Sequence, residues 1–105
     1  MRVLLLLAAA CASAPESAPP PCTAVGGHVY LLAKTALAKT PVDAQTRATL
    51  ESELPALRDT VVARCRDTAW PGSVRQCMAA ATDHPAFVAC EDALTEAQRA
   101  GRDPW

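Results

Sequence analysis

The sequence lacks the usual marks of a redox, nucleic-acid-binding or catalytic protein. It has no Cys-x-x-Cys pair, which excludes the common thioredoxin-like, zinc-ribbon and c-type haem signatures. It has no block of Lys or Arg with interleaved aromatic residues, so we expect no nucleic-acid partner. Ser52, Ser73 and the two histidines form neither a nucleophile elbow nor a triad order. We therefore expect no enzyme, no catalytic residue and no cofactor.

The sequence also lacks an apolar run long enough to cross a bilayer, which takes about 20 residues. Its N-terminus has one basic residue, an apolar segment over 3–10 and then small residues, a pattern typical of an export leader. The segment Leu7-Ala8-Ala9-Ala10-Cys11 looks like the lipobox of bacterial lipoproteins, although its leucine lies one position early. We predict a signal peptide over 1–10 and a lipid-anchored Cys11. The alternative is ordinary secretory cleavage after Ala14, which removes Cys11.

Residues 11–21 have no large apolar side chain and contain four prolines. Such a segment cannot bury enough surface to offset its chain entropy, so we predict a disordered tether. The folded domain is expected over 22–101, followed by a frayed tail over 102–105. A domain of this size has a marginal hydrophobic core, and additional cross-links are expected.

Apolar residues in the domain recur at steps of three and four, the period of one helix face. Together with the Pro and Gly positions, this spacing predicts helices near 22–38, 42–66, 72–82 and 85–100, with a kink or restart at Pro55. No run alternates with a period of two, so strands are not expected. The predicted fold class is all-α, a small disulfide-stapled bundle of about four helices arranged as two hairpins.

Two local signals concern the first helical hairpin. Gly26 and Gly27 are poor helix formers, so either the first helix begins near His28 or the pair lets another backbone come close. Thr40-Pro41-Val42-Asp43 is typical of a helix start. We expect Thr40 to cap the second helix and Pro41 to occupy its first position.

Four of the five cysteines, Cys22, Cys65, Cys77 and Cys90, fall on the apolar faces of predicted helices. In an exported chain this pattern indicates two disulfides, for which three connectivities exist. Cys77 and Cys90 lie at similar distances on either side of the 82–85 turn, so they are expected at the same height on neighbouring antiparallel helices. Cys22 at the start of the first helix and Cys65 at the end of the second have the same relation across the first hairpin. We predict the pairs Cys22–Cys65 and Cys77–Cys90.

The chain resembles a class of small uncharacterised bacterial lipoproteins with a four-cysteine helical domain. The resemblance covers most of the chain and depends on its leader and tether and on the residues Cys22, His28, Cys65, Arg66, Asp67, Trp70, Cys77, Cys90, Leu94, Thr95 and Gln98. It implies the compartment and the cross-linked helical fold. It implies no activity.

These observations lead to two functional hypotheses. The first is a non-enzymatic helical protein that binds a partner or has a structural role, exported to the bacterial cell envelope and held on the periplasmic membrane face through Cys11. A secreted or periplasmic form is the alternative location, and a protein partner is possible. The second hypothesis is periplasmic metal handling by His28, Met78 or His84, because imidazole and thioether groups suit copper. For each of these residues a structural role is the simpler interpretation, and we predict no metal ligands.

Overall fold

The computed structural model describes residues 18–99, and every regular element in this part of the chain is helical. The elements are α2 (Cys22–Ala38), α3 (Ala44–Asp67), α4 (Gly72–Ala80), α5 (His84–Ala89), the 3-10 helix η1 (Cys90–Ala93) and α6 (Glu96–Arg99). The predicted all-α fold class is confirmed. None of the helices in the described range is long and apolar enough to span a membrane.

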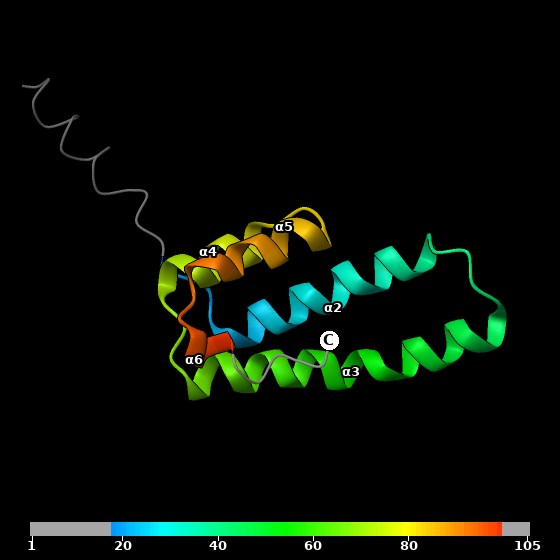
Figure 1. The fold of residues 1–105 in the computed structure, drawn as a ribbon, viewed down its shortest axis with the longest axis horizontal. Helices are drawn as coiled ribbons and strands as arrows, with labels where there is room; N and C mark the ends of the chain where they lie inside the picture. The colour runs from blue at the N-terminus through cyan, green and yellow to red at the C-terminus, as the bar shows by residue number, and fades with distance from the viewer. Residues whose placement is uncertain (1–17, 100–105) are drawn as a thin grey trace, which may run out of the picture.

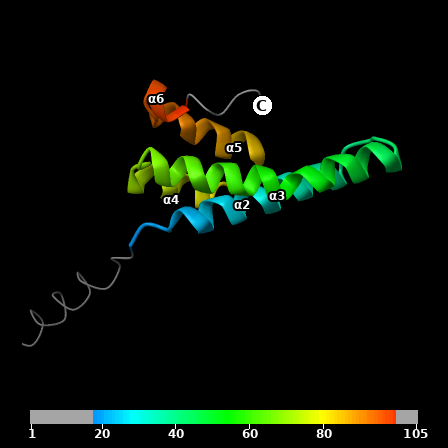
Figure 2. The same ribbon diagram turned by 90° about the horizontal axis from the view of Figure 1, so that it is seen from below.

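Helices α2 and α3 form a long antiparallel hairpin, and the shorter helices pack as a second layer over one end of it (Figures 1 and 2). The hydrophobic core lies at this covered end. It consists of Val25, Val29, Cys65, Trp70, Val74, Met78, Ala81, Phe87, Cys90 and Leu94. The end of the hairpin that carries the α2–α3 loop extends beyond the second layer (Figure 1). Apolar side chains near that end therefore have fewer neighbours to cover them.

One glycine of the pair in α2 allows the two long helices to approach closely. Helix α2 begins at Cys22, so it includes both glycines. A Cβ at Gly26 would collide with Cγ2 of Val62 and lie 2.9 Å from the carbonyl oxygen of Arg58, whereas a Cβ at Gly27 would meet nothing within 4 Å. Of the two interpretations left open by the sequence, the close approach is correct, and only Gly26 is responsible for it.

The predicted start of the second helix is wrong by two to three residues. Thr40 does not cap α3. Its backbone N–H donates to the carbonyl of Leu37 and its hydroxyl donates to that of Ala36, so it closes the end of α2. Asp43 is the cap instead, accepting a 2.7 Å hydrogen bond from the backbone N–H of Thr46. That bond is the main cause of the lowered pKa of the Asp43 carboxyl. Both Thr and Asp are good caps. Thr40 is still bonded to the last turn of α2, so the next suitable residue, Asp43, caps α3.

Pro55 lies within α3, which continues from Ala44 to Asp67 without a restart. Pro55 and the residue four positions before it, Glu51, are both exposed. The carbonyl that lacks a donor because of the proline is therefore on a solvent-accessible side of the helix, where water can replace the missing bond.

The two disulfides join the pairs predicted from the sequence. Cys22 in the first turn of α2 is bonded to Cys65 near the end of α3, with their Cα atoms 5.7 Å apart. Cys77 of α4 is bonded to Cys90, where the corresponding distance is 6.0 Å. Both distances are ordinary for a disulfide. The placement of Cys77 on the buried face of α4 was wrong, because this residue is exposed and only Cys90 of the pair is buried.

The turn between α4 and α5 attaches the second layer to the hairpin. Helix α4 ends at Ala80, two residues before the predicted end, because Ala81 is extended. Asp83 then caps α5 by accepting a 2.8 Å hydrogen bond from the N–H of Ala86. The ring Nε2 of His28 lies 2.6 Å from the carbonyl oxygen of Ala81. His28 therefore connects α2 to this turn.

The domain makes contacts before its first helix. The predicted tether over 11–21 is described only from residue 18 onward. Within this part, the carbonyl of Pro20 accepts a 2.7 Å hydrogen bond from the guanidinium of Arg75. Pro19 lies against Gly72, where a Cβ would come within 2.7 Å of its ring. The last residues of the tether are thus part of the packed domain.

The predicted single helix over 85–100 is wrong. The chain forms α5 and η1, becomes extended at Leu94 and begins again as α6. A reciprocal cap causes the new start: the N–H of Thr95 donates to Oε1 of Gln98, and the N–H of Gln98 donates to the hydroxyl of Thr95. Nε2 of Gln98 also donates to the carbonyl of Thr68 at 3.0 Å. This contact holds α6 against the corner between α3 and α4.

Candidate functional site

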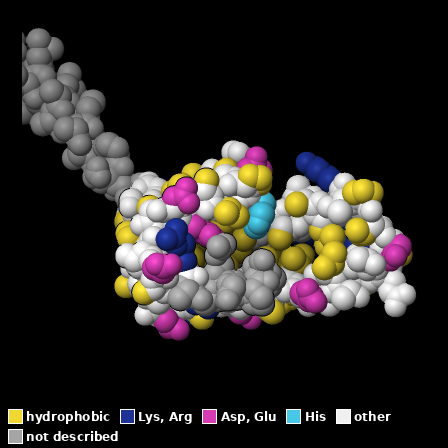
Figure 3. All heavy atoms as spheres, viewed as in Figure 1, with side chains coloured by type: hydrophobic (Ala, Val, Ile, Leu, Met, Phe, Trp, Pro, Cys, Tyr) yellow, Lys and Arg dark blue, Asp and Glu magenta, His cyan; other side chains and the backbone are white. Residues whose placement is uncertain are grey.

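The candidate site is a groove of about 430 Å³ between the α2–α3 hairpin and the segment from α5 to α6. Most of its wall is apolar, and hydrophobic side chains are visible on this face between α5 and the far part of the hairpin (Figure 3). It is lined by Val29, Ala33, Ala36, Leu37, Thr40, Leu50, Glu53, Leu54, Leu57, Thr60, Val61, Arg64, Trp70, His84, Phe87, Val88, Glu91, Leu94, Gln98 and Arg99. These residues come from every helical element except α4.

The groove exists because the second layer is much shorter than the hairpin. Apolar residues at the three-four spacing face inward along both α2 and α3. At the covered end they are buried in the core. Further along, Leu50 on one wall and Val88 on the other keep 38% and 36% of their surface exposed. Apolar side chains of the groove walls with this exposure form a surface that a ligand can cover.

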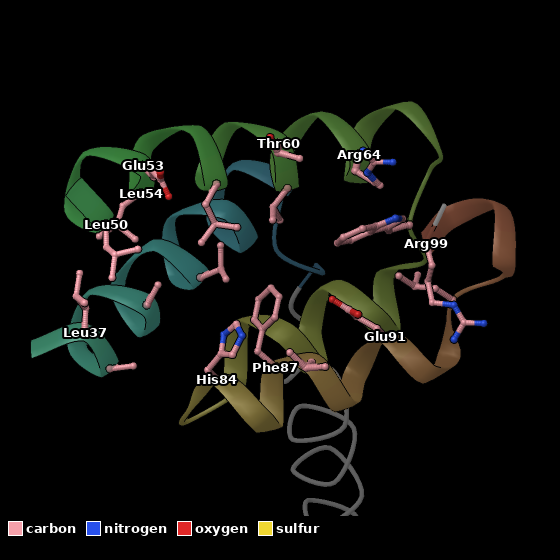
Figure 4. A pocket seen from close by; sticks show the side chains of 18 of the residues that line it. Leu37, Leu50, Glu53, Leu54, Thr60, Arg64, His84, Phe87, Glu91 and Arg99 are labelled. Atoms are coloured by element: carbon pink, nitrogen blue, oxygen red, sulfur yellow. The ribbon is translucent and has the colours of Figure 1, made fainter. Parts of the chain in front are cut away.

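The two arginines of the lining lie toward one end of the groove. Figure 4 shows Arg64, Glu91 and Arg99 on that side, whereas Leu37, Leu50 and Glu53 lie on the opposite side. Glu91 is buried, with 9% of its surface exposed. The groove thus has its cationic side chains at one end and leucines with a single carboxylate at the other.

Trp70 also lines the groove, and only 7% of its surface is exposed. It lies in the segment between α3 and α4 and belongs to the hydrophobic core. Its indole Nε1 is buried and has no hydrogen-bond acceptor in the described part of the chain. A buried donor of this kind is unusual in native proteins.

The residues proposed for metal handling occupy three different environments. Met78 is fully buried in the core. Nε2 of His28 is engaged with the carbonyl of Ala81, and His84 is exposed on the groove wall. Within residues 18–99 there is no group of three or more His, Cys, Asp or Glu side chains that could hold a metal ion.

The groove could not be predicted from the sequence. The spacing of the leucines and valines assigns them to helix faces but does not give the relative lengths of the two layers. One usable signal was present in the sequence Thr95-x-x-Gln98, which is a capping pattern that would have placed a break before α6. Cys11, the predicted lipidation site, lies outside the described residues.

The two disulfides indicate an oxidising, extracytoplasmic compartment, because such bonds are rare where thiols are kept reduced. Comparison of the sequence with models of protein families gave no match, and comparisons with curated proteins and with solved structures gave none either.

Proposed function

We propose that this protein is a non-enzymatic, exported binding protein whose groove holds an apolar ligand. The observation that carries the proposal is the groove itself, which has a largely apolar wall and a volume of about 430 Å³. Sites for small ligands typically have volumes of about 300 to 1,000 Å³ and are lined mainly by apolar side chains with a few polar groups. Binding would remove the exposed surface of Leu50 and Val88 from water.

The disulfides also support a binding function. Cys22–Cys65 joins α2 to α3 within one layer, and Cys77–Cys90 joins α4 to η1 within the other. A groove between two internally cross-linked layers has less conformational entropy to lose when a ligand enters.

We expect the double variant Leu50→Asp/Val88→Asp to bind a neutral apolar probe at least about tenfold more weakly than the native protein. It places one carboxylate on each wall of the groove, where an apolar ligand would have to desolvate both. The measurement is the fluorescence of N-phenyl-1-naphthylamine titrated with the oxidised protein. Circular dichroism would verify that the variant remains helical.

The matched control is Leu31→Asp/Ala38→Asp, which introduces the same charges at exposed positions of α2 that do not line the groove. It should bind the probe as the native protein does. Ala36→Trp, at an exposed position that does line the groove, should also weaken binding by filling it. Native probe affinity in both groove variants, or an equal loss in the control, would contradict the proposal.

The proposal includes anchoring of the exported protein to a membrane of the bacterial envelope through diacylglycerol on Cys11. The leader, the lipobox-like segment and the extracytoplasmic compartment support it. We expect Cys11→Ser to move the protein out of the membrane fraction and to abolish incorporation of labelled palmitate. Two acyl chains contribute about 0.8 kcal/mol per buried methylene, and the tether has no large apolar side chain of its own. A mature native protein that begins at Pro15 would contradict the anchor while leaving the groove proposal intact.

A further inference from the structure

The two ends of the groove differ in the side chains that line them, and this difference indicates the chemistry of its ligand. Leu37, Leu50 and Leu54 lie together at one end, while Arg64 and Arg99 lie toward the other (Figure 4). A ligand that follows the groove therefore meets mainly leucine side chains at one end, where Glu53 is a charged lining residue, and two arginines toward the other. A molecule with an apolar chain and a charged head matches this arrangement.

Arg99 is the cation that a ligand head can reach. It lines the groove and is partly buried, and its guanidinium has no hydrogen-bond or ion-pair partner among residues 18–99. Its position is determined by the neighbouring Gln98, whose Nε2 donates to the carbonyls of Thr68 and Ala69. A partly buried guanidinium without a partner in the described range has a desolvation cost that an anionic ligand would offset.

A second donor at the same end of the groove also lacks an acceptor. Trp70 lines the same groove as Arg99, and the residue before it, Ala69, accepts from Nε2 of Gln98, the residue before Arg99. The indole Nε1 of Trp70 is buried and has no acceptor in the described part of the chain. Two donors in need of acceptors favour a head that consists of oxygen atoms.

The charges at this end favour an anion. At this end the groove is lined by two arginines, Arg64 and Arg99, and one carboxylate, Glu91, whereas the other lining carboxylate, Glu53, lies at the leucine end. We propose that the ligand is a single-chain amphiphile with an anionic oxygen head, the chemistry of a fatty acid. Its chain lies at the leucine end and its head at Arg99. This inference rests on the proposed function, because it assigns a ligand class to the same groove.

The test compares three ligands with the same alkyl chain, namely decanoate, decanol and decyltrimethylammonium, as competitors of N-phenyl-1-naphthylamine on the oxidised protein. Decanoate should compete at least about tenfold more strongly than decanol, because it adds a charge-assisted hydrogen bond to Arg99. The cationic ligand should be the weakest. The variant Arg99→Gln should lose the preference for decanoate without altering competition by decanol.

Arg66→Gln is the matched control, since Arg66 is exposed on α3, does not line the groove and carries the same charge. It should retain the full preference for decanoate. Equal competition by the three ligands, or an equal effect of both arginine variants, would overturn the inference while leaving the binding function standing. If the neutral probe itself does not bind, the proposed function fails and the inference fails with it. Competition by a partner-derived amphipathic peptide but not by decanoate would also overturn the inference.

Discussion

Replacing Cys22 and Cys65 together by alanine should lower the free energy of unfolding by about 4 kcal/mol. The bond closes a loop with a sequence separation of 43, and its removal restores the conformational freedom of that loop in the unfolded chain. It also joins the ends of α2 and α3 where the core residues Val25 and Val29 pack. Small domains have total stabilities of about 5 to 15 kcal/mol, so this loss would leave the protein near its unfolding threshold. Urea denaturation of the oxidised variants measures it.

The control for loop length is Cys77→Ala/Cys90→Ala, which opens a loop with a separation of 13. The same relation gives a loss of about 3 kcal/mol. Both variants should retain helical circular dichroism below their transitions. A greater loss from the shorter loop would show that core packing around Cys90, rather than chain entropy, dominates the contribution of the disulfides.

Gly26→Ala should destabilise the protein by about 1 to 3 kcal/mol, the usual cost of overpacking. The new Cβ would collide with Cγ2 of Val62 and approach the carbonyl oxygen of Arg58 to 2.9 Å. The carbonyl belongs to the backbone of α3, so relieving the collision requires the two helices to separate. Thermal and urea denaturation of the oxidised protein measure the change.

Gly27→Ala is the matched control for this prediction. It makes the same chemical change one residue further along α2, at a position where a Cβ has nothing within 4 Å. Alanine is the better helix former by about 0.5 to 1 kcal/mol, so the protein should become more stable by a similar amount. Destabilisation of similar size by both substitutions would mean that helix approach at Gly26 is not the cause.

Much of the covalent and secondary structure could be predicted from sequence because its signals are local. The three-four spacing of apolar residues predicted α2 with its observed bounds. The cysteine positions predicted both disulfides, because cysteines at similar distances from a turn come level in an antiparallel hairpin. Helix periodicity is contained in a few residues, and the pairing of the cysteines follows from it once two consecutive helices are taken as antiparallel neighbours.

Competing local signals were harder to resolve. Thr40 and Asp43 are both suitable caps, and the contacts that close α2 decide between them. The apolar spacing after Pro85 favours one helix, but the Thr95–Gln98 cap interrupts it. Gln98 also bonds to the carbonyl of Thr68, which is 30 residues away in sequence. No local pattern contains a contact of that kind.

By itself, the sequence determined an all-helical domain, the positions of its long helices and the cysteine pairs that cross-link it, because helix periodicity and turn chemistry act over a few residues. Only the tertiary structure decided that Gly26 is the point of close approach, that α6 turns back onto the corner before Trp70 and that a groove remains between the layers. A groove depends on how far one layer extends past another. That relation arises from the packing of distant segments, so the spacing of residues within any one helix does not encode it.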